Sequence, residues 1–136
     1  MSVAIGAGNI GSGNGAVAID DRNVATGQGA VAMGADNTAT GTGAVAIGNG
    51  NTALGQGSVA LGNNSRARQI ATVAIGDGVA TTRAGQVAIG NAASTTTLAG
   101  IVSSASLAAQ TGVAWGGVAG LPTCYQTYGR ARLLSA

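Results

Sequence analysis

The sequence predicts an all-β solenoid, in which short strands stack coil upon coil, and three observations predict it. A segment of the form Val-Ala-hydrophobic-Gly occurs seven times, with Asp20 in place of the glycine once. Each copy begins 14 residues after the previous one, with no insertion or deletion. Glycines recur where such a short coil has to turn. A fixed period held over this many copies is typical of a repeat architecture.

The length of the repeat predicts the content of each coil. A strand of about five residues spans roughly 17 Å, so 14 residues hold two strands and two tight corners. A unit that contains a helix needs a longer stretch of chain. We therefore predict a parallel β-roll of seven coils over residues 2–99, in which neighbouring coils pair their backbones. Residues 100–136 leave the pattern and are predicted to be a short irregular segment.

Alternation along the first strand predicts which side chains lie inside. The valine and the following branched residue are two positions apart, so we expect both in the core and the alanine between them outside. A strip of outward alanines is a candidate contact surface, because only 7% of the chain is charged. A closed trimer would bury three such strips, although single surface alanines also need no explanation. The predicted trimer-interface residues are Ala4, Ala18, Ala32, Ala46, Ala60, Ala74 and Ala88.

The repeats resemble those of the YadA-like head of trimeric autotransporter adhesins. The resemblance covers residues 2 to about 99, and residues 44–57 (AVAIGNGNTALGQG) match the repeat best. It implies a left-handed parallel β-roll, a homotrimer and an adhesive role. The coiled-coil stalk and the membrane-anchor barrel of that family have no counterpart in this sequence. Residues 1–20 contain no basic segment followed by a long apolar run, so we expect neither a signal peptide nor a transmembrane helix.

The composition argues against catalysis and against metal or cofactor binding. The chain has no histidine and a single cysteine, Cys124, and no nucleophile–base pair or metal-ligand cluster can be recognised. Gly6–Gly11 has the spacing of a dinucleotide fingerprint, but a second strand rather than a helix follows it. We therefore expect a non-enzyme with no cofactor and no metal. A net charge of +2 is too small for nucleic-acid binding.

Two polar patterns invite a binding hypothesis. Arg66 and Arg68 share one side of a strand, and Arg83 lies near the same edge one coil later. In a trimer they would form a ring of nine guanidinium groups that could bind acidic glycans or phosphates; the alternative is a solvated rim. A ladder of threonines begins at Thr38, as in an ice-binding solenoid, but Leu54 and the arginines interrupt it.

The C-terminal segment carries the chain's aromatic residues. Residues 113–123 resemble a W-x-x-V-x-G-x-P-T element of phage tail fibres. Concentrated aromatics predict a local core or a docking surface, so residues 100–136 are expected to lock the trimer or to attach it to a larger assembly. The candidate attachment residues are Trp115, Pro122, Tyr125 and Tyr128. The favoured hypothesis is a trimeric fibre, spike or tip protein of a phage virion, in contact with other virion proteins and with a host-surface glycan or protein. The alternatives are a fragment of a bacterial cell-surface adhesin, or a virion decoration protein without a receptor.

Overall fold

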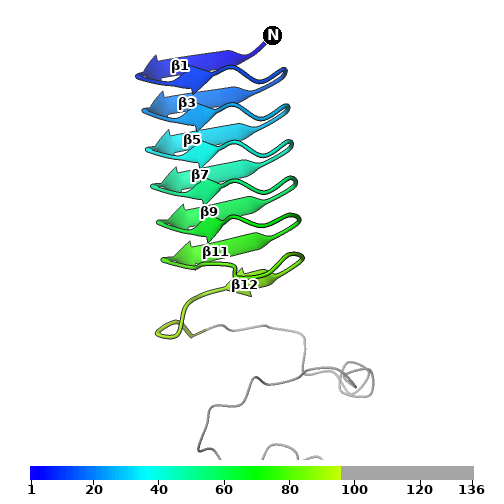
Figure 1. The fold of residues 1–136 in the computed structure, drawn as a ribbon. Coiled ribbons are helices and arrows are strands. Elements are labelled where there is room, and N and C mark those ends of the chain that lie inside the picture. Colours follow the sequence, from blue (N-terminus) through cyan, green and yellow to red (C-terminus); the bar gives the residue numbers. More distant parts are fainter. Residues whose placement is uncertain (96–136) are drawn as a thin grey trace, which may run out of the picture. The chain divides into compact units, whose positions relative to one another are not determined.

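The computed structural model describes residues 1–95, which form an all-β solenoid of about six turns with no helix in that range (Figure 1). Contacts within the chain group Met1–Thr97 into one unit. The predicted parallel roll of 14-residue coils is confirmed. The predicted C-terminal segment, residues 100–136, lies outside the described residues. Coils are numbered below from their first valine, so that coil one covers residues 3–16 and coil five covers residues 59–72.

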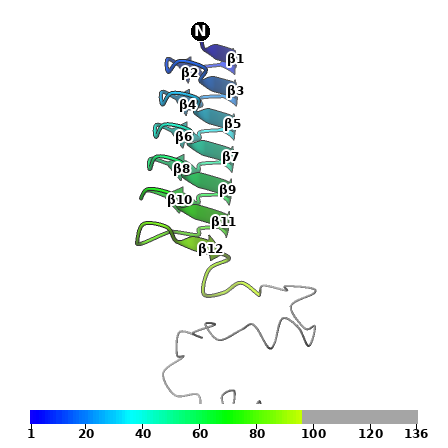
Figure 2. The ribbon, with the colours of Figure 1, turned by 90° about the vertical axis from the view of Figure 1, so that its right-hand side faces the viewer.

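Two parallel sheets form the walls of the roll, and their strands lie on opposite sides of each coil (Figure 2). The first sheet contains β1 (Val3–Ala7), β3 (Val17–Asp21), β5 (Val31–Ala35), β7 (Val45–Asn49), β9 (Val59–Asn63), β11 (Val73–Asp77) and β12 (Val87–Ile89). The second sheet contains β2 (Ile10–Gly11), β4 (Val24–Ala25), β6 (Thr38–Ala39), β8 (Thr52–Ala53) and β10 (Arg66–Ala67). An isolated bridge from Arg66 to Ala80 extends the second wall by one coil.

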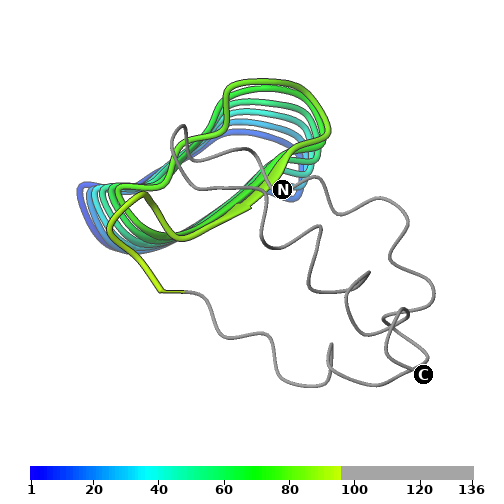
Figure 3. The same cartoon turned by 90° about the horizontal axis from the view of Figure 1, so that it is seen from below.

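The register between coils follows the sequence period. Val45 pairs with Val31 on one side and with Val59 on the other, and the other paired residues keep the same interval. Loop backbones are bonded from coil to coil as well: the N–H of Gly43 donates to the carbonyl of Gln28 at 2.8 Å. Seen along the roll, the coils superpose as one flattened outline (Figure 3). This pairing supplies partners for the polar backbone of a chain that has few large side chains.

The interior is lined by small side chains, and this corrects the predicted assignment of the two strand faces. The alanines of the first sheet from coil two to coil six are fully buried, whereas Val45 is only half-buried and Ile47 is 37% exposed. Alanines of the second sheet, such as Ala53, face them and are also fully buried. The sheets lie too close for larger residues: a Cβ added to Gly11 would lie 3.7 Å from Cβ of Ala4. The branched residues therefore point outward.

A column of asparagines fills the inside of one corner, a feature that the sequence analysis missed. Asn23, Asn37 and Asn51 are fully buried. The Nδ2 group of Asn37 donates to the carbonyl of Met33 at 2.9 Å and to that of Gly48 in the next coil at 2.7 Å. The column therefore bonds each coil to the next at a corner where the backbone leaves regular pairing. The signal was present as the recurrence of asparagine at 14-residue intervals from Asn9 to Asn51.

The same corner explains one column of glycines. Gly34, Gly48 and Gly62 have φ values between 104° and 120°. Residues that carry a Cβ atom rarely adopt this backbone conformation. A Cβ added to Gly48 would lie 2.0 Å from the carbonyl oxygen of Gly62. Asp20 occupies this place in coil two with φ 92°, so that coil carries a strained backbone.

Candidate functional site

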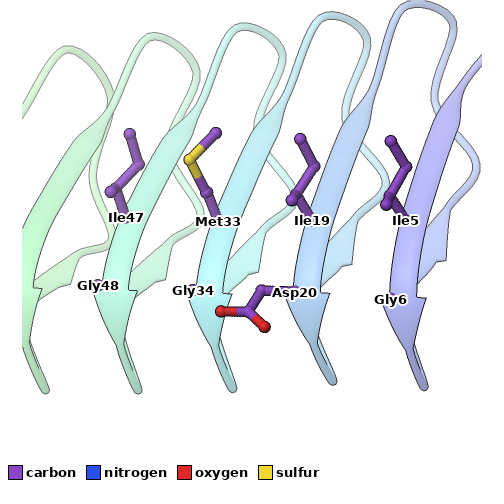
Figure 4. Close-up of a pocket in the computed structure, with 8 residues that line it drawn as sticks. All are labelled: Ile5, Gly6, Ile19, Asp20, Met33, Gly34, Ile47 and Gly48. Carbon is purple, nitrogen blue, oxygen red and sulfur yellow. The ribbon is translucent and has the colours of Figure 1, made fainter.

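Two outward columns of the first sheet form a continuous apolar surface, named here the branched face. Its two columns consist of the outward valine and the outward branched residue or methionine of each coil. Figure 4 shows Ile5, Ile19, Met33 and Ile47 in one row along neighbouring strands. They line a shallow groove together with the corner column of Gly6, Asp20, Gly34 and Gly48. The full set is Val3, Val17, Val31, Val45, Val59, Val73 and Val87, with Ile5, Ile19, Met33, Ile47, Leu61, Ile75 and Ile89.

The branched face has the properties of a contact surface. Met33 is 38% exposed and Ile5, in the end coil, is 59% exposed. In the row that Figure 4 draws, the only charged side chain is that of Asp20. A contiguous apolar surface that extends over every coil is a candidate contact surface.

The seven alanines predicted as a trimer interface are not part of this surface. Ala18, Ala32, Ala46, Ala60 and Ala74 are fully buried within a single chain, so no partner chain can touch them. Ala88 is partly buried and packs against the same core. Ala4 is exposed, but it pairs with Ala18 in register, and its exposure reflects its position in the first coil, which has a neighbouring coil on one side only. The prediction was wrong because it assigned the branched residues to the interior.

The outer face of the second sheet is different in character. From coil two to coil four it presents Val24 and Thr26, then Thr38 and Thr40, then Thr52 and Leu54. In coil five the corresponding positions are Arg66 and Arg68, both exposed on either side of the buried Ala67. Both arginines therefore point away from the buried side of the strand. The first wall therefore carries two apolar columns outside and ends in polar residues such as Asn49 and Asn63, whereas the second wall is mixed and becomes basic.

Arg83 is also exposed, at the corner of coil six. It follows Thr82, which is one period after Arg68, so Arg83 lies one coil along the roll from the first two arginines. No ion pair joins Arg66, Arg68 or Arg83 to a carboxylate within residues 1–95. In contrast, Arg22 Nε lies 3.0 Å from Asp36 Oδ1 and 3.4 Å from Asp21 Oδ2.

The described residues offer no metal centre and no membrane helix. Within residues 1–95, no group of three histidine, cysteine or acidic side chains is placed to hold a metal ion. No helix in that range is long and apolar enough to cross a bilayer. The candidate attachment residues Trp115, Pro122, Tyr125 and Tyr128, together with Cys124, lie outside the described residues.

Comparison with known protein families assigns the central coils. Residues 25–51 and 53–78 match two copies of the YadA head domain repeat. Residues 25–78 of the roll are YadA head repeats. The resemblance stated from residues 44–57 is therefore confirmed, and the YadA-like roll is an adhesin-type structural fold rather than an enzyme fold. No curated protein matches the chain.

Proposed function

We propose that this chain is the adhesive rod of a surface structure and that three copies pack through their branched faces around a common axis. The observation that carries the proposal is the continuous row of outward valines and isoleucines in a roll of YadA head repeats. In a closed trimer these rows face the axis, and the three second sheets face the solvent. The rod then presents the same outer wall three times, so weak contacts with a host surface are reinforced by effective concentration.

The energetics favour association through this face. Apolar surface contributes about 25 cal/mol for each Å² removed from water, and every coil from two to six adds two outward apolar side chains. The second sheet has no comparable row, because threonines and arginines interrupt it. A trimer rather than a dimer is proposed because the YadA head repeats resemble the head of trimeric autotransporter adhesins.

The biological setting that we propose is the tail fibre, spike or tip of a phage virion. The element at residues 113–123, which resembles tail fibres, supports this setting. Trp115, Pro122, Tyr125 and Tyr128 would then attach the rod to other virion proteins. The roll itself would then bind a glycan or protein of the host cell surface.

A second candidate is a fragment of a bacterial trimeric adhesin on a cell surface. The YadA head repeats at residues 25–78 support this candidate. Locating the protein with a specific antibody separates the candidates, since labelling of virion tails supports the phage fibre and labelling of the cell surface supports the adhesin. Labelling of the capsid surface would support a decoration protein instead.

The trimer is tested by the mass of the full chain in solution, measured by light scattering on a sizing column. We expect three times 12.8 kDa for the wild type. Met33→Glu places a charge on the branched face and is expected to give folded monomers. Thr40→Glu, on the exposed outer face of the second sheet in the same coil, is the matched control and should keep the trimer mass. A monomeric wild type, or equal effects of the two variants, contradicts the proposal.

Adhesion is tested separately. Fluorescently labelled full-length protein is mixed with cells of the host, and bound fluorescence is measured by flow cytometry. We expect saturable binding by the wild type and binding at least tenfold weaker for Met33→Glu, because a monomer lacks the gain from multivalency. Unchanged binding by a monomeric variant would show that the rod does not depend on three copies.

A further inference from the structure

We infer that Arg66, Arg68 and Arg83 form a binding site for an acidic glycan on the outer wall of coils five and six. The inference deepens the proposed adhesive function by naming the class of ligand, and it rests on that function. It starts from the unequal distribution of charge along the roll. Residues 1–95 contain four arginines, and three of them lie within these two coils.

The three arginines are available for a ligand. All three side chains are exposed, and no residue within the described range pairs with their guanidinium groups. Three carboxylates of the roll have other partners. Asp21 and Asp36 pair with Arg22, and Asp77 Oδ1 accepts a hydrogen bond from Asn63 Nδ2 at 2.7 Å. A guanidinium group is a planar donor that matches carboxylate, sulfate and phosphate oxygens.

The backbone geometry sets where two of these arginines leave the wall. Arg66 lies in β10, whose backbone pairs with β8 on one side and with Ala80 on the other. Residues two positions apart on an extended chain have Cβ atoms roughly 7 Å apart, so Arg66 and Arg68, which directly follows β10, leave the same wall side by side. Because the backbone of Arg66 is hydrogen-bonded on both sides, ligand binding costs little backbone conformational entropy there.

The neighbouring columns show that the arginines are departures from the repeat. At the place of Arg66 the two preceding coils have Thr52 and Thr38, and at the place of Arg68 coil three has Thr40. At the place of Arg83, coils one to four have glycine. The fold therefore accepts threonine or glycine at these positions, and nothing in the coil geometry requires a cation there.

The surroundings favour a glycan over a nucleic acid. Thr52, Gln69 and Thr82 border the arginines and carry hydroxyl and amide groups of the kind that bind sugar hydroxyls. Gln69 Oε1 also accepts a bond from Thr81, and Thr82 Oγ1 donates to Gln86. Residues 1–95 contain no aromatic residue on which a base could stack. The ligand chemistry is that of a polysaccharide that carries carboxylate, sulfate or phosphate groups.

The experiment is a titration of the full-length protein, by calorimetry in low-salt buffer, with two probes. A polygalacturonate oligosaccharide carries carboxylates, and a heparin oligosaccharide carries sulfates as well. We expect the wild type to bind at least one of them, with an affinity that falls as salt is added. The combined variant Arg66→Thr, Arg68→Thr and Arg83→Gly should bind at least tenfold more weakly.

Two further variants make the result specific. Arg22→Asn removes a positive charge elsewhere and takes the residue type found at the same place in coil five, Asn64; it should change the affinity by less than twofold. Arg66→Thr alone removes the same charge within the site and should weaken binding at least threefold. Equal effects of these two single variants would show that binding follows net charge, and would overturn the site.

The remaining outcomes are equally decisive. A wild type that binds neither probe, or a combined variant that binds like the wild type, overturns the inference. A duplex DNA oligonucleotide that displaces the glycan and binds more tightly would replace the glycan with a nucleic acid. The mass of each variant is measured in parallel: loss of binding with the trimer intact concerns the arginine site, whereas a wild-type monomer that still binds the glycan contradicts only the proposed trimer.

Discussion

Asn37 occupies the same position inside the roll as Asn23, one coil later, and two hydrogen bonds join the two residues. The backbone N–H of Asn37 donates to Oδ1 of Asn23 at 3.1 Å, and Nδ2 of Asn37 donates to the same oxygen at 3.0 Å. Asn51 repeats both bonds to Asn37 at 3.0 Å. The column is thus a continuous polar ladder in an interior otherwise lined mainly by methyl groups.

Removing one member of the ladder should destabilise the roll strongly. Asn37→Ala leaves the carbonyls of Met33 and Gly48 without this donor and the N–H of Asn51 without its acceptor. Each unsatisfied buried group costs about 1–3 kcal/mol, so we expect a loss of roughly 3 kcal/mol or more in the free energy of unfolding. Urea unfolding followed by circular dichroism measures it at fixed protein concentration.

A matched substitution controls for the loss of volume. Asn37→Ser introduces the residue that coil five has at this place, Ser65, whose Oγ donates to the carbonyl of Gly76 at 2.8 Å. It should cost less than the alanine variant because one bond to the next coil is kept. Equal losses for the two variants would mean that the ladder acts through packing rather than through its hydrogen bonds.

Asp20→Gly should stabilise the roll. Asp20 has φ 92° at a corner where coils three to six have glycine, and such a backbone conformation costs a side-chain residue about 1–3 kcal/mol. We expect a gain of roughly 1 kcal/mol, since the freer unfolded chain offsets part of the relief. Thermal unfolding checks the direction.

The reverse change serves as the contrast to Asp20→Gly. A Cβ at Gly48 would lie 2.0 Å from the carbonyl oxygen of Gly62 and 3.0 Å from Nδ2 of Asn51. Gly48→Ala should therefore lower the melting temperature while Asp20→Gly raises it. A decrease for both variants would show that Asp20 contributes a contact that outweighs its backbone strain.

Ser58→Ala should be neutral or stabilising. Ser58 Oγ is buried and has no hydrogen-bond partner within residues 1–95, and coils two and three have Ala30 and Ala44 at the same place. Removing an unsatisfied buried hydroxyl is expected to gain about 1 kcal/mol. Ser65→Ala, which removes a bonded hydroxyl, should be destabilising in the same urea assay. A clear loss of stability for Ser58→Ala would reveal a partner for the hydroxyl.

Substitutions at two neighbouring positions should have different effects, because one side chain points into the roll and the other points outward. Ala46→Val adds two methyl groups to a fully buried position and should destabilise each chain by about 1–3 kcal/mol through overpacking. Val45→Ala removes methyl groups from the branched face and should weaken self-association more than it weakens the fold. Unfolding and solution mass are measured for both. Tolerance of valine at position 46, together with unfolding of Val45→Ala, would contradict the inward orientation of the alanines.

The corner glycines could be predicted from the sequence, whereas the role of the asparagine column could not. The corner glycines were identified because a coil of 14 residues leaves few residues for its turns. The asparagine column repeats at the same interval, but its role depends on a corner that turns the side chains inward to reach carbonyls of two coils. Asn37 could equally have been an exposed turn residue.

The 14-residue period alone determined the parallel pairing, the two strands in each coil and the register, because no other short unit satisfies its backbone groups at that spacing. The alternation of Val45, Ala46 and Ile47 determined that the alanine faces away from the other two, but not which side is inside. Only the tertiary structure decided that. The two walls of so narrow a coil approach until methyl groups fill the space between them, so the larger side chains point outward and become the surface through which we propose that three rolls associate.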